Sequence, residues 1–411
     1  MASVKEQFVV SPKMKTWSMV LIAIGVIAFI LGLITKGVSK DEHERAIFIG
    51  TLMYNTIFWM LICNASMFFL CATTLAMGGW HAVIKRIPEA ISTLVPVFGI
   101  ITLSIFIYVV VIDHSGFVYE WVNKDVVAKD AALKGKSGFL NPFFFMIWSI
   151  LAIGLWSLLG YRMRRLSSEA DEKPMDMETG KSYIWRNTVT AALFIVWFAL
   201  TVGSTVPWFW LMSLDAHWYS TMYSWYTFAS SFVTGMSLIA LWLIYLKNKG
   251  YLQYANQDHL HNIGIFMFAF SIFWTYLWFA QYMLIWYANI PEETIYFKHR
   301  VQGAYKGIFF MNLIINFVCP LLILMKRSVK RNYTLMTFTA VLIIFGHWID
   351  FYQMVMGSIR KEDATLSWLD FGIASLFIGL MIHFTGRALA KKPLVSEYHP
   401  FLKESIVHHT T

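Results

Sequence analysis

The sequence predicts an all-α integral membrane protein with about ten transmembrane helices. Of its 411 residues, 58% are hydrophobic and only 14% are charged, which is more apolar than a soluble domain of this length needs. The apolar residues form long continuous runs, and the polar connections between the runs are short. We therefore expect one polytopic membrane domain over residues 1–411 and no soluble domain.

Ten apolar runs are long enough to cross roughly 30 Å of hydrocarbon. They lie near residues 16–35, 46–77, 90–112, 139–161, 188–213, 220–246, 262–288, 304–325, 334–357 and 366–389. The second and sixth runs look longer than a span requires, so we expect them to tilt or protrude. We expect the second to fifth runs and the sixth to ninth runs to form two four-helix bundles, with the first and tenth runs at their flanks. The polar start of the chain shows no small-residue cleavage site, so we expect the first helix to be retained.

The distribution of basic residues predicts the orientation. The N-terminal segment, the even-numbered connections and the C-terminal tail carry 21 Lys and Arg, against 11 in the opposite connections. Because cytoplasmic connections are enriched in Lys and Arg, we expect both termini in the cytoplasm. The net charge of +9 lies at membrane borders, so it gives no reason to expect a nucleic-acid partner.

Cofactor sites are not predicted for this chain. Its three cysteines lie in apolar runs without a CxxC pair, and no HExxH or acidic metal-binding cluster occurs. A haem b site needs two histidines at matched depth. His347 falls near the middle of its run and His383 falls in the inner third of the next, so that pairing is not expected.

Titratable residues inside the ninth run, "IIFGHWIDFYQMVMG" (343–357), are the main functional signal. His347 and Asp350 share one helix face, and Gln353 continues it. Ionisable groups within a bilayer mark functional sites by default, although a structural pair that fixes the helix against a neighbour is the alternative. We predict a proton path centred on His347 and Asp350, with Asp370 on its outer limb.

Other polar residues fall at depths that could extend such a path. Asn64 and the inner-side Glu89 could serve, with water, on the approach from the cytoplasm, although interhelical hydrogen bonding is the other role for Asn64. Asp215 and His217 lie at the outer end of the fifth run. They are either an ordinary wet turn, a proton exit, or part of an outer-side quinol site.

Three stretches carry a resemblance to a known family: "WFWLMSLDAHWYSTMYSWYTFASSFVTGMSL" (208–238), "GHWIDFYQMV" (346–355) and "GGWHAVIKRIPEAISTLVPVFGI" (78–100). They resemble the ActF-type membrane subunits of bacterial alternative complex III, within the NrfD/PsrC-like family. The resemblance implies a multi-pass subunit of the bacterial inner membrane, in a respiratory complex that oxidises quinol, such as menaquinol. Electrons then pass to a periplasmic cytochrome c or to an associated terminal oxidase. The implied partners are multihaem and monohaem cytochrome c subunits carrying haem c, an Fe–S subunit with its clusters, and a sister NrfD-like membrane subunit.

The sequence leaves three possible functions open. The first is a cofactor-free respiratory-complex subunit that serves as a scaffold with a proton path. The second is an NrfD-like quinol-binding subunit, in which Asp215, His217 and Asp370 would lie at a suitable depth. The third is a stand-alone secondary transporter with a midplane site at His347 and Asn312. Against it, the prolines at 96, 207 and 320 do not form the paired helix breaks of such folds.

Overall fold

Helices make up the regular structure of the chain. The computed structural model describes residues 6–361 and 363–410, and within these residues no strand occurs. The helices are α1 (Pro12–Gly32), α2 (Glu42–Leu75), α3 (Arg86–Ile91), α4 (Val95–Phe106), α5 (Lys124–Lys129), α6 (Ala131–Lys136), α7 (Pro142–Glu172), α8 (Met177–Gly203), α9 (Met222–Asn248), α10 (Gln257–Ala288), α11 (Pro291–Val301), α12 (Lys306–Leu313), α13 (Cys319–Leu324), α14 (Tyr333–Ile359), α15 (Trp368–Ala390) and α16 (Leu402–Ile406).

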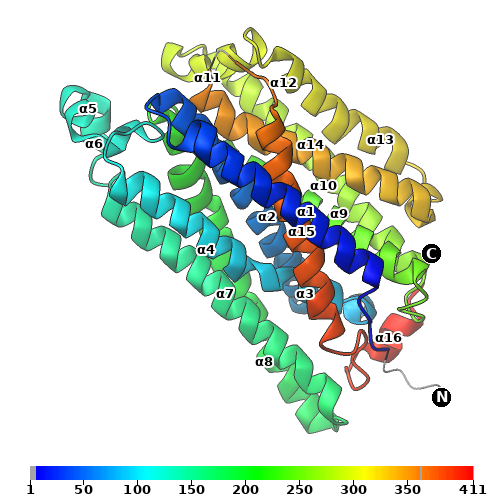
Figure 1. Cartoon of the computed structure of the whole chain (residues 1–411). Coiled ribbons are helices and arrows are strands. Elements are labelled where there is room, and N and C mark those ends of the chain that lie inside the picture. The colour runs from blue at the N-terminus through cyan, green and yellow to red at the C-terminus, as the bar shows by residue number, and fades with distance from the viewer. Residues whose placement is uncertain (1–5, 362, 411) are drawn as a thin grey trace.

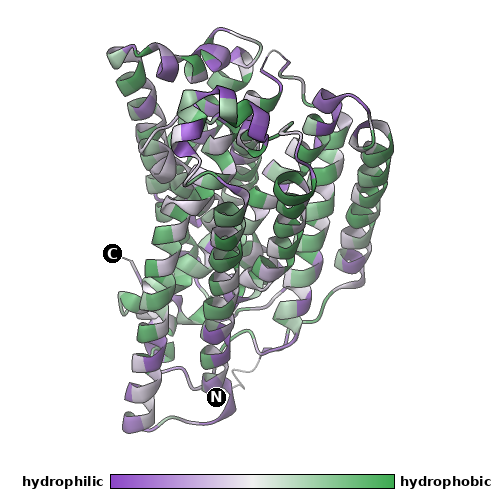
Figure 2. Cartoon of the chain, turned by 90° about the vertical axis from the view of Figure 1, so that its left-hand side faces the viewer, coloured by the Kyte–Doolittle hydropathy of each residue, from purple (hydrophilic) through white to green (hydrophobic). Residues whose placement is uncertain are grey.

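The ten predicted membrane spans are confirmed. In the described part of the chain, ten helical segments are long and apolar enough to cross a membrane. Four of them join two labelled pieces or continue through irregular turns: α1 with the π-helical turn after it (Pro12–Gly37), α3 with α4 (Arg86–Ile112), α8 with the turns after it (Met177–Asp215), and α12 with α13 (Lys306–Leu324). Figure 2 shows hydrophobic residues along the middle of the helices and hydrophilic residues towards both ends of the molecule.

The two predicted four-helix bundles are also present. In the first, α2, α4, α7 and α8 pack against one another in a ring, and in the second α9, α10, α12 with α13, and α14 do the same. Helix α2 joins the bundles, because it also packs against α9 and α14. Every residue of its most apolar stretch is buried, so α2 is the central helix of the protein.

Helices α1 and α15 form a tight pair outside the two bundles, and Figure 1 shows them side by side. Glycines permit the close approach. A Cβ atom on Gly25 would lie 2.3 Å from the Cβ of Leu376, and one on Gly372 would lie 2.3 Å from the Cβ of Ala28. Small residues at such crossings let helix backbones come close, which is how helices associate in lipid.

Irregular turns interrupt three spans near their prolines. A 3₁₀ turn (Ser92–Leu94) precedes Pro96, a π-helical turn (Thr205–Leu211) contains Pro207, and another (Ile314–Val318) ends two residues before Pro320. Proline lacks an N–H and clashes with the preceding turn, which accounts for these breaks. The breaks fall in the third, fifth and eighth spans, so they do not occupy corresponding positions in the two bundles.

The longest connections are more helical than the sequence suggested. The apolar runs predicted at 139–161 and 188–213 leave a polar connection between them, but α7 continues to Glu172 and α8 begins at Met177. A two-pronged ion pair between Arg186 and Glu169, with N···O distances of 3.0 and 2.6 Å, ties the two extensions together. Hydropathy does not detect these turns because they extend beyond the apolar run. The connection at 113–138 likewise contains α5 and α6.

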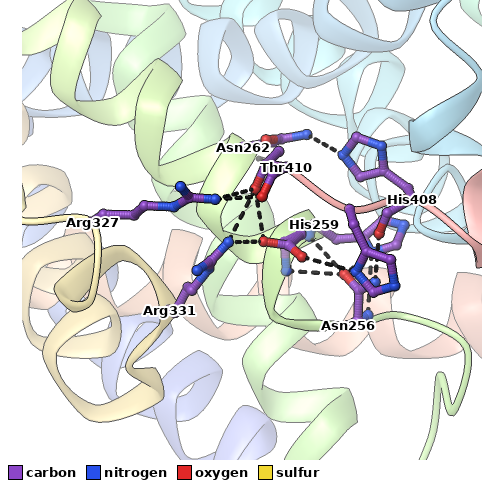
Figure 3. Close-up of polar contacts among 9 residues, drawn as sticks. Asn256, His259, Asn262, Arg327, Arg331, His408 and Thr410 are labelled. Atoms are coloured by element: carbon purple, nitrogen blue, oxygen red, sulfur yellow. Dashed lines mark hydrogen bonds and ion pairs between the residues drawn. The ribbon is translucent and has the colours of Figure 1, made fainter.

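Both ends of the described chain lie at the same end of the molecule. The backbone N–H of Leu394 donates to the carbonyl of Glu6 (2.9 Å), and the Glu6 carboxylate accepts from the N–H of Gln253 (3.0 Å) in the α9–α10 connection. The C-terminal tail is anchored at the start of α10. In Figure 3, Arg327 and Arg331 reach Thr410, whose hydroxyl donates to Asp258 at 2.8 Å.

The opposite end of the molecule carries α5, α6 and α11 (Figure 1). We call it the outer end below, after the orientation expected from the distribution of basic residues.

Candidate functional site

The predicted pair lies in the middle of α14, a helix of 27 residues. His347 is fully buried and the Asp350 side chain is 1% exposed. Their facing atoms, His347 Nδ1 and Asp350 Oδ2, are 3.7 Å apart. The Ser230 hydroxyl of α9 lies between them, 2.8 Å from Nδ1 and 3.3 Å from Oδ2. A hydroxyl in this position can accept a proton from the ring while donating its own to the carboxylate.

Three side chains from two other helices hold the Asp350 carboxylate. Tyr226 of α9 donates a hydrogen bond to Oδ1, while Trp274 of α10 (3.2 Å) and Ser230 donate to Oδ2. The edge of the Trp274 ring also packs against His347, with ring centroids 5.2 Å apart. A buried carboxylate with several donors is satisfied in its charged form, which an apolar surrounding alone would not permit.

A small cavity begins at Asp350 on the outer side of the pair. Its volume is about 20 Å³, and its polar lining includes Tyr226, Gln281, Arg300 and Gln353. The side-chain nitrogens of Gln281 and Gln353 are buried, and the described residues offer them no hydrogen-bond partner. A cavity that holds one water needs roughly 10–15 Å³ and two to four polar partners. This space therefore fits one water molecule next to Asp350.

Arg300 of α11 forms the far wall of this cavity and leads to the outer surface. It is 2% exposed, and its guanidinium lies 3.4 Å from the centre of the Tyr296 ring. Nη2 donates to the carbonyl of Gln353 at 3.3 Å and lies 3.5 Å from the Ser358 hydroxyl. That hydroxyl donates to Asp215 at 3.1 Å, and Asp215 is half-buried. Polar groups thus continue from Asp350 to the outer end of the molecule.

Unpaired polar atoms mark the inner side of the pair. His347 Nε2 is buried without a hydrogen-bond partner among the described residues, and so are both amide atoms of Asn316 and of Asn64. Asn316 lies in the π-helical turn of the eighth span, where its Oδ1 would be 2.1 Å from a Cβ on Gly346. Buried amides without protein partners are rare, and ordered water usually satisfies them. Among the described residues, Asn64 therefore makes no interhelical hydrogen bond, which was the other role considered for it.

Glu89 belongs to a separate polar cluster near the inner end. Arg86 donates to its carboxylate (2.6 Å) and also forms an ion pair with Asp171. The other Glu89 oxygen is buried without a partner in the described chain, and it borders a cavity of about 40 Å³. Lys85 lines the same cavity. Burial, and next the charge of Arg86, lower the pKa of Lys85 to about 7. No hydrogen bond connects this cluster to His347 in the described residues.

Asp370 lies on a different side of α14 from Asp350. Its carboxylate caps the start of α15, where Ser367 donates to it from the backbone (2.8 Å) and from the hydroxyl (2.7 Å). On α2, Tyr54 (2.9 Å) and Thr51 (3.3 Å) also donate to it. Asp350 is held instead by α9 and α10. The role of Asp370 as the outer limb stays a prediction, and its contacts are those of a helix cap.

His217 and Asp215 have different surroundings despite their closeness in the sequence. The His217 side chain is 50% exposed, and its Nε2 lies 2.7 Å from Asp130, the residue that caps α6. Asp215 faces inward to Ser358. Of the two, Asp215 belongs to the outward series of contacts from Asp350.

Sequence reasoning did not find Tyr226, Ser230, Trp274 or Arg300. The first three look like ordinary members of apolar spans, and nothing in their spacing indicates which helix they face. Arg300 lies in the polar segment "PEETIYFKHRV", which reads as an exposed connection. The one sign of this in the sequence was that Arg300 follows Tyr296 by four residues. On a helix this spacing places the aromatic ring and the cation on one face.

In the described residues, no three His, Cys, Asp or Glu side chains are grouped so that they could hold a metal ion. The expectation that this chain binds no cofactor stays a prediction. No protein-family model matches the sequence, and no curated protein matches it.

Proposed function

We propose that the chain is an integral membrane subunit of a respiratory quinol:cytochrome c, or oxidase-linked, oxidoreductase of the alternative complex III type, and that it carries a proton path centred on His347 and Asp350. The observation that carries the path is the buried pair in the middle of α14, bridged by Ser230. Ionisable groups at this depth are costly, so they are retained mainly where they have a function. The assignment to a respiratory complex rests on the sequence resemblance.

A proton moves outward through this site in three steps. His347 takes it up at Nε2 from the side of Asn316 and Asn64, where water would satisfy the unpaired amides. Nδ1 releases a proton to Ser230, which passes its own to Asp350. From Asp350 the proton passes through the water-sized cavity towards Asp215, beside Arg300, whose contacts with Gln353 and Ser358 hold the far wall of the cavity in place.

The proposal places redox chemistry in the partners. These are the cytochrome c subunits, the Fe–S subunit and the sister membrane subunit, in the bacterial inner membrane with both termini of this chain in the cytoplasm. Quinol binding within this chain has less support, because the three residues suggested for it have separate partners: Asp215 accepts from Ser358, His217 pairs with Asp130, and Asp370 caps α15.

Substitution of the pair tests the path. Asp350→Asn should leave the complex assembled with its haem content unchanged, while quinol-driven proton translocation falls strongly. Asp370→Asn is the companion variant, since it changes a buried carboxylate that also has several donors. It should lower stability; proton translocation per electron stays intact if Asp370 only caps α15, and falls if Asp370 forms the outer limb of the path. If Asp350→Asn and His347→Leu complexes translocate protons as the unmodified complex does, the pair is structural.

A further inference from the structure

A long apolar groove opens on the side of the molecule between the α1–α15 pair and the second bundle. Its volume is about 750 Å³. Helices α1 and α15 line one side and α9 and α14 line the other, while Trp59 of the central helix α2 contributes at mid-depth. It is separate from the cavity at Asp350, with which it shares no lining residue.

The two ends of the groove differ in chemistry. At the end that carries the chain termini, the groove is bordered by Lys13 at the start of α1 and by Lys249, which follows the end of α9. Both lysines are exposed, and in the described part of the chain neither forms an ion pair. At the other end the groove meets Trp348, which packs against Phe371 with ring centroids 5.5 Å apart.

The length of the groove matches one leaflet of a bilayer. Phe371 and Ile382 lie eleven residues apart on α15, which is roughly 16 Å along a helix axis. The hydrocarbon core of a bilayer is about 30 Å thick, so one leaflet is about half of that. An occupant that runs from the lysines to the aromatic end therefore spans a single leaflet, with its polar group at the termini side.

We propose that this groove binds one anionic phospholipid of the leaflet on the side of the termini. Its phosphate and glycerol lie between Lys13 and Lys249, and its acyl chains fill the groove towards Trp348. The two lysines supply the charge that an anionic headgroup complements, and basic residues at a membrane border attract anionic lipids in this way. The lipid also fills the space between α1–α15 and the second bundle, which the protein's own side chains leave open.

The test uses the full-length chain, extracted from membranes in mild detergent with whatever assembly accompanies it. Native mass spectrometry would measure the binding of phosphatidylglycerol and of phosphatidylethanolamine, each added alone at matched concentrations. The unmodified chain should retain one phosphatidylglycerol in preference to phosphatidylethanolamine. At about 1 kcal/mol for each lysine, Lys13→Gln with Lys249→Gln should weaken phosphatidylglycerol binding roughly 30-fold and leave phosphatidylethanolamine binding unchanged.

Two further variants make the result specific. Lys181→Gln with Lys326→Gln removes two exposed lysines at the same end of the molecule that do not border the groove, and it should have no effect. Val341→Trp fills the groove from an exposed position on α14, and it should reduce retention of both lipids. Equal retention of the two lipids by the unmodified chain would overturn the proposal. So would equal weakening of phosphatidylglycerol binding by the two lysine pairs.

Discussion

The indole nitrogen of Trp274 on α10 donates a hydrogen bond of 3.2 Å to the carboxylate of Asp350 on α14. Tyr226 and Ser230 on α9 donate to the same carboxylate, so three helices meet at one buried charge. Hydrogen bonds to a carboxylate are among the strong ones, so these three donors fix its position, and Ser230 connects it to the neighbouring His347. The proposed proton path therefore depends on the environment of Asp350 more than on its position along α14.

Removal of the Tyr226 hydroxyl should impair proton movement more than it impairs assembly. Tyr226→Phe takes one donor from Asp350 without changing the packing of the ring, and a hydrogen bond to a charged group contributes about 1.5–3 kcal/mol. Tyr54→Phe is the matched control, because Tyr54 donates to the other buried carboxylate, Asp370. Proton translocation per electron, measured on complexes of equal haem content, should fall in Tyr226→Phe alone. An equal decrease in both variants would contradict a special role for Asp350.

Arg300 should control the release of protons to the outer end. Arg300→Gln removes the charge beside the cavity and loses the contacts with Gln353 and Ser358, so both stability and proton release should decrease. Arg360→Gln is the control: Arg360 is a buried arginine at the same end, bonded to the carbonyl of Thr365 and outside the series of contacts from Asp350.

The measurement is the number of protons released on the outer side per electron, together with the unfolding midpoint. Both arginine variants should unfold at a lower temperature, and only Arg300→Gln should release fewer protons. A normal release from Arg300→Gln would place the exit elsewhere.

The sequence predicted the spans, the two bundles and the buried pair, because long apolar runs are typical of membrane helices and titratable residues within them are rare. It could not predict which neighbours each polar residue meets. Its expected depth in the membrane suggested Asp370 as the outer limb of the proton path. In the structure, the rotation of α14 turns Asp350 towards α9 and α10, whereas Asp370 caps α15 and faces α2. Rotation follows from packing between helices, which hydropathy does not record. Arg300 was missed for a related reason, since its burial depends on α11 folding over the bundle.

Buried Lys85 predicts that stability rises with pH above neutrality. Burial lowers its folded-state pKa to about 7 from an ordinary value of 10.5, so between these values the unfolded chain holds a proton that the folded chain lacks. Stability increases with pH wherever the unfolded state binds more protons, by at most about 1.4 kcal/mol per pH unit for one group. Below pH 7 both states are protonated and the contribution is constant.

Lys85→Met should remove this rise. The variant should be more stable than the unmodified chain at pH 6, and the difference should shrink as the pH increases to 9. Thermal unfolding in detergent across that range would measure it, with Lys181→Met as a control at an exposed lysine. A constant difference between the Lys85→Met chain and the unmodified chain at every pH would show that Lys85 does not titrate in this window.

The orientation predicted from charge can be tested with two single cysteines. Lys173, which follows the end of α7, and Asp125 in α5 are both exposed and lie at opposite ends of the molecule. The end with the termini carries the larger number of basic residues, so Lys173 should face the cytoplasm and Asp125 the periplasm. A membrane-impermeant thiol reagent added to intact cells should label Asp125→Cys and spare Lys173→Cys. Of the native cysteines, Cys63 and Cys71 are buried and Cys319 is partly buried, so labelling of the unmodified chain gives the background. The reverse labelling pattern would invert the whole path, so that Arg300 and Asp215 would form its cytoplasmic entrance and the inner amides its exit.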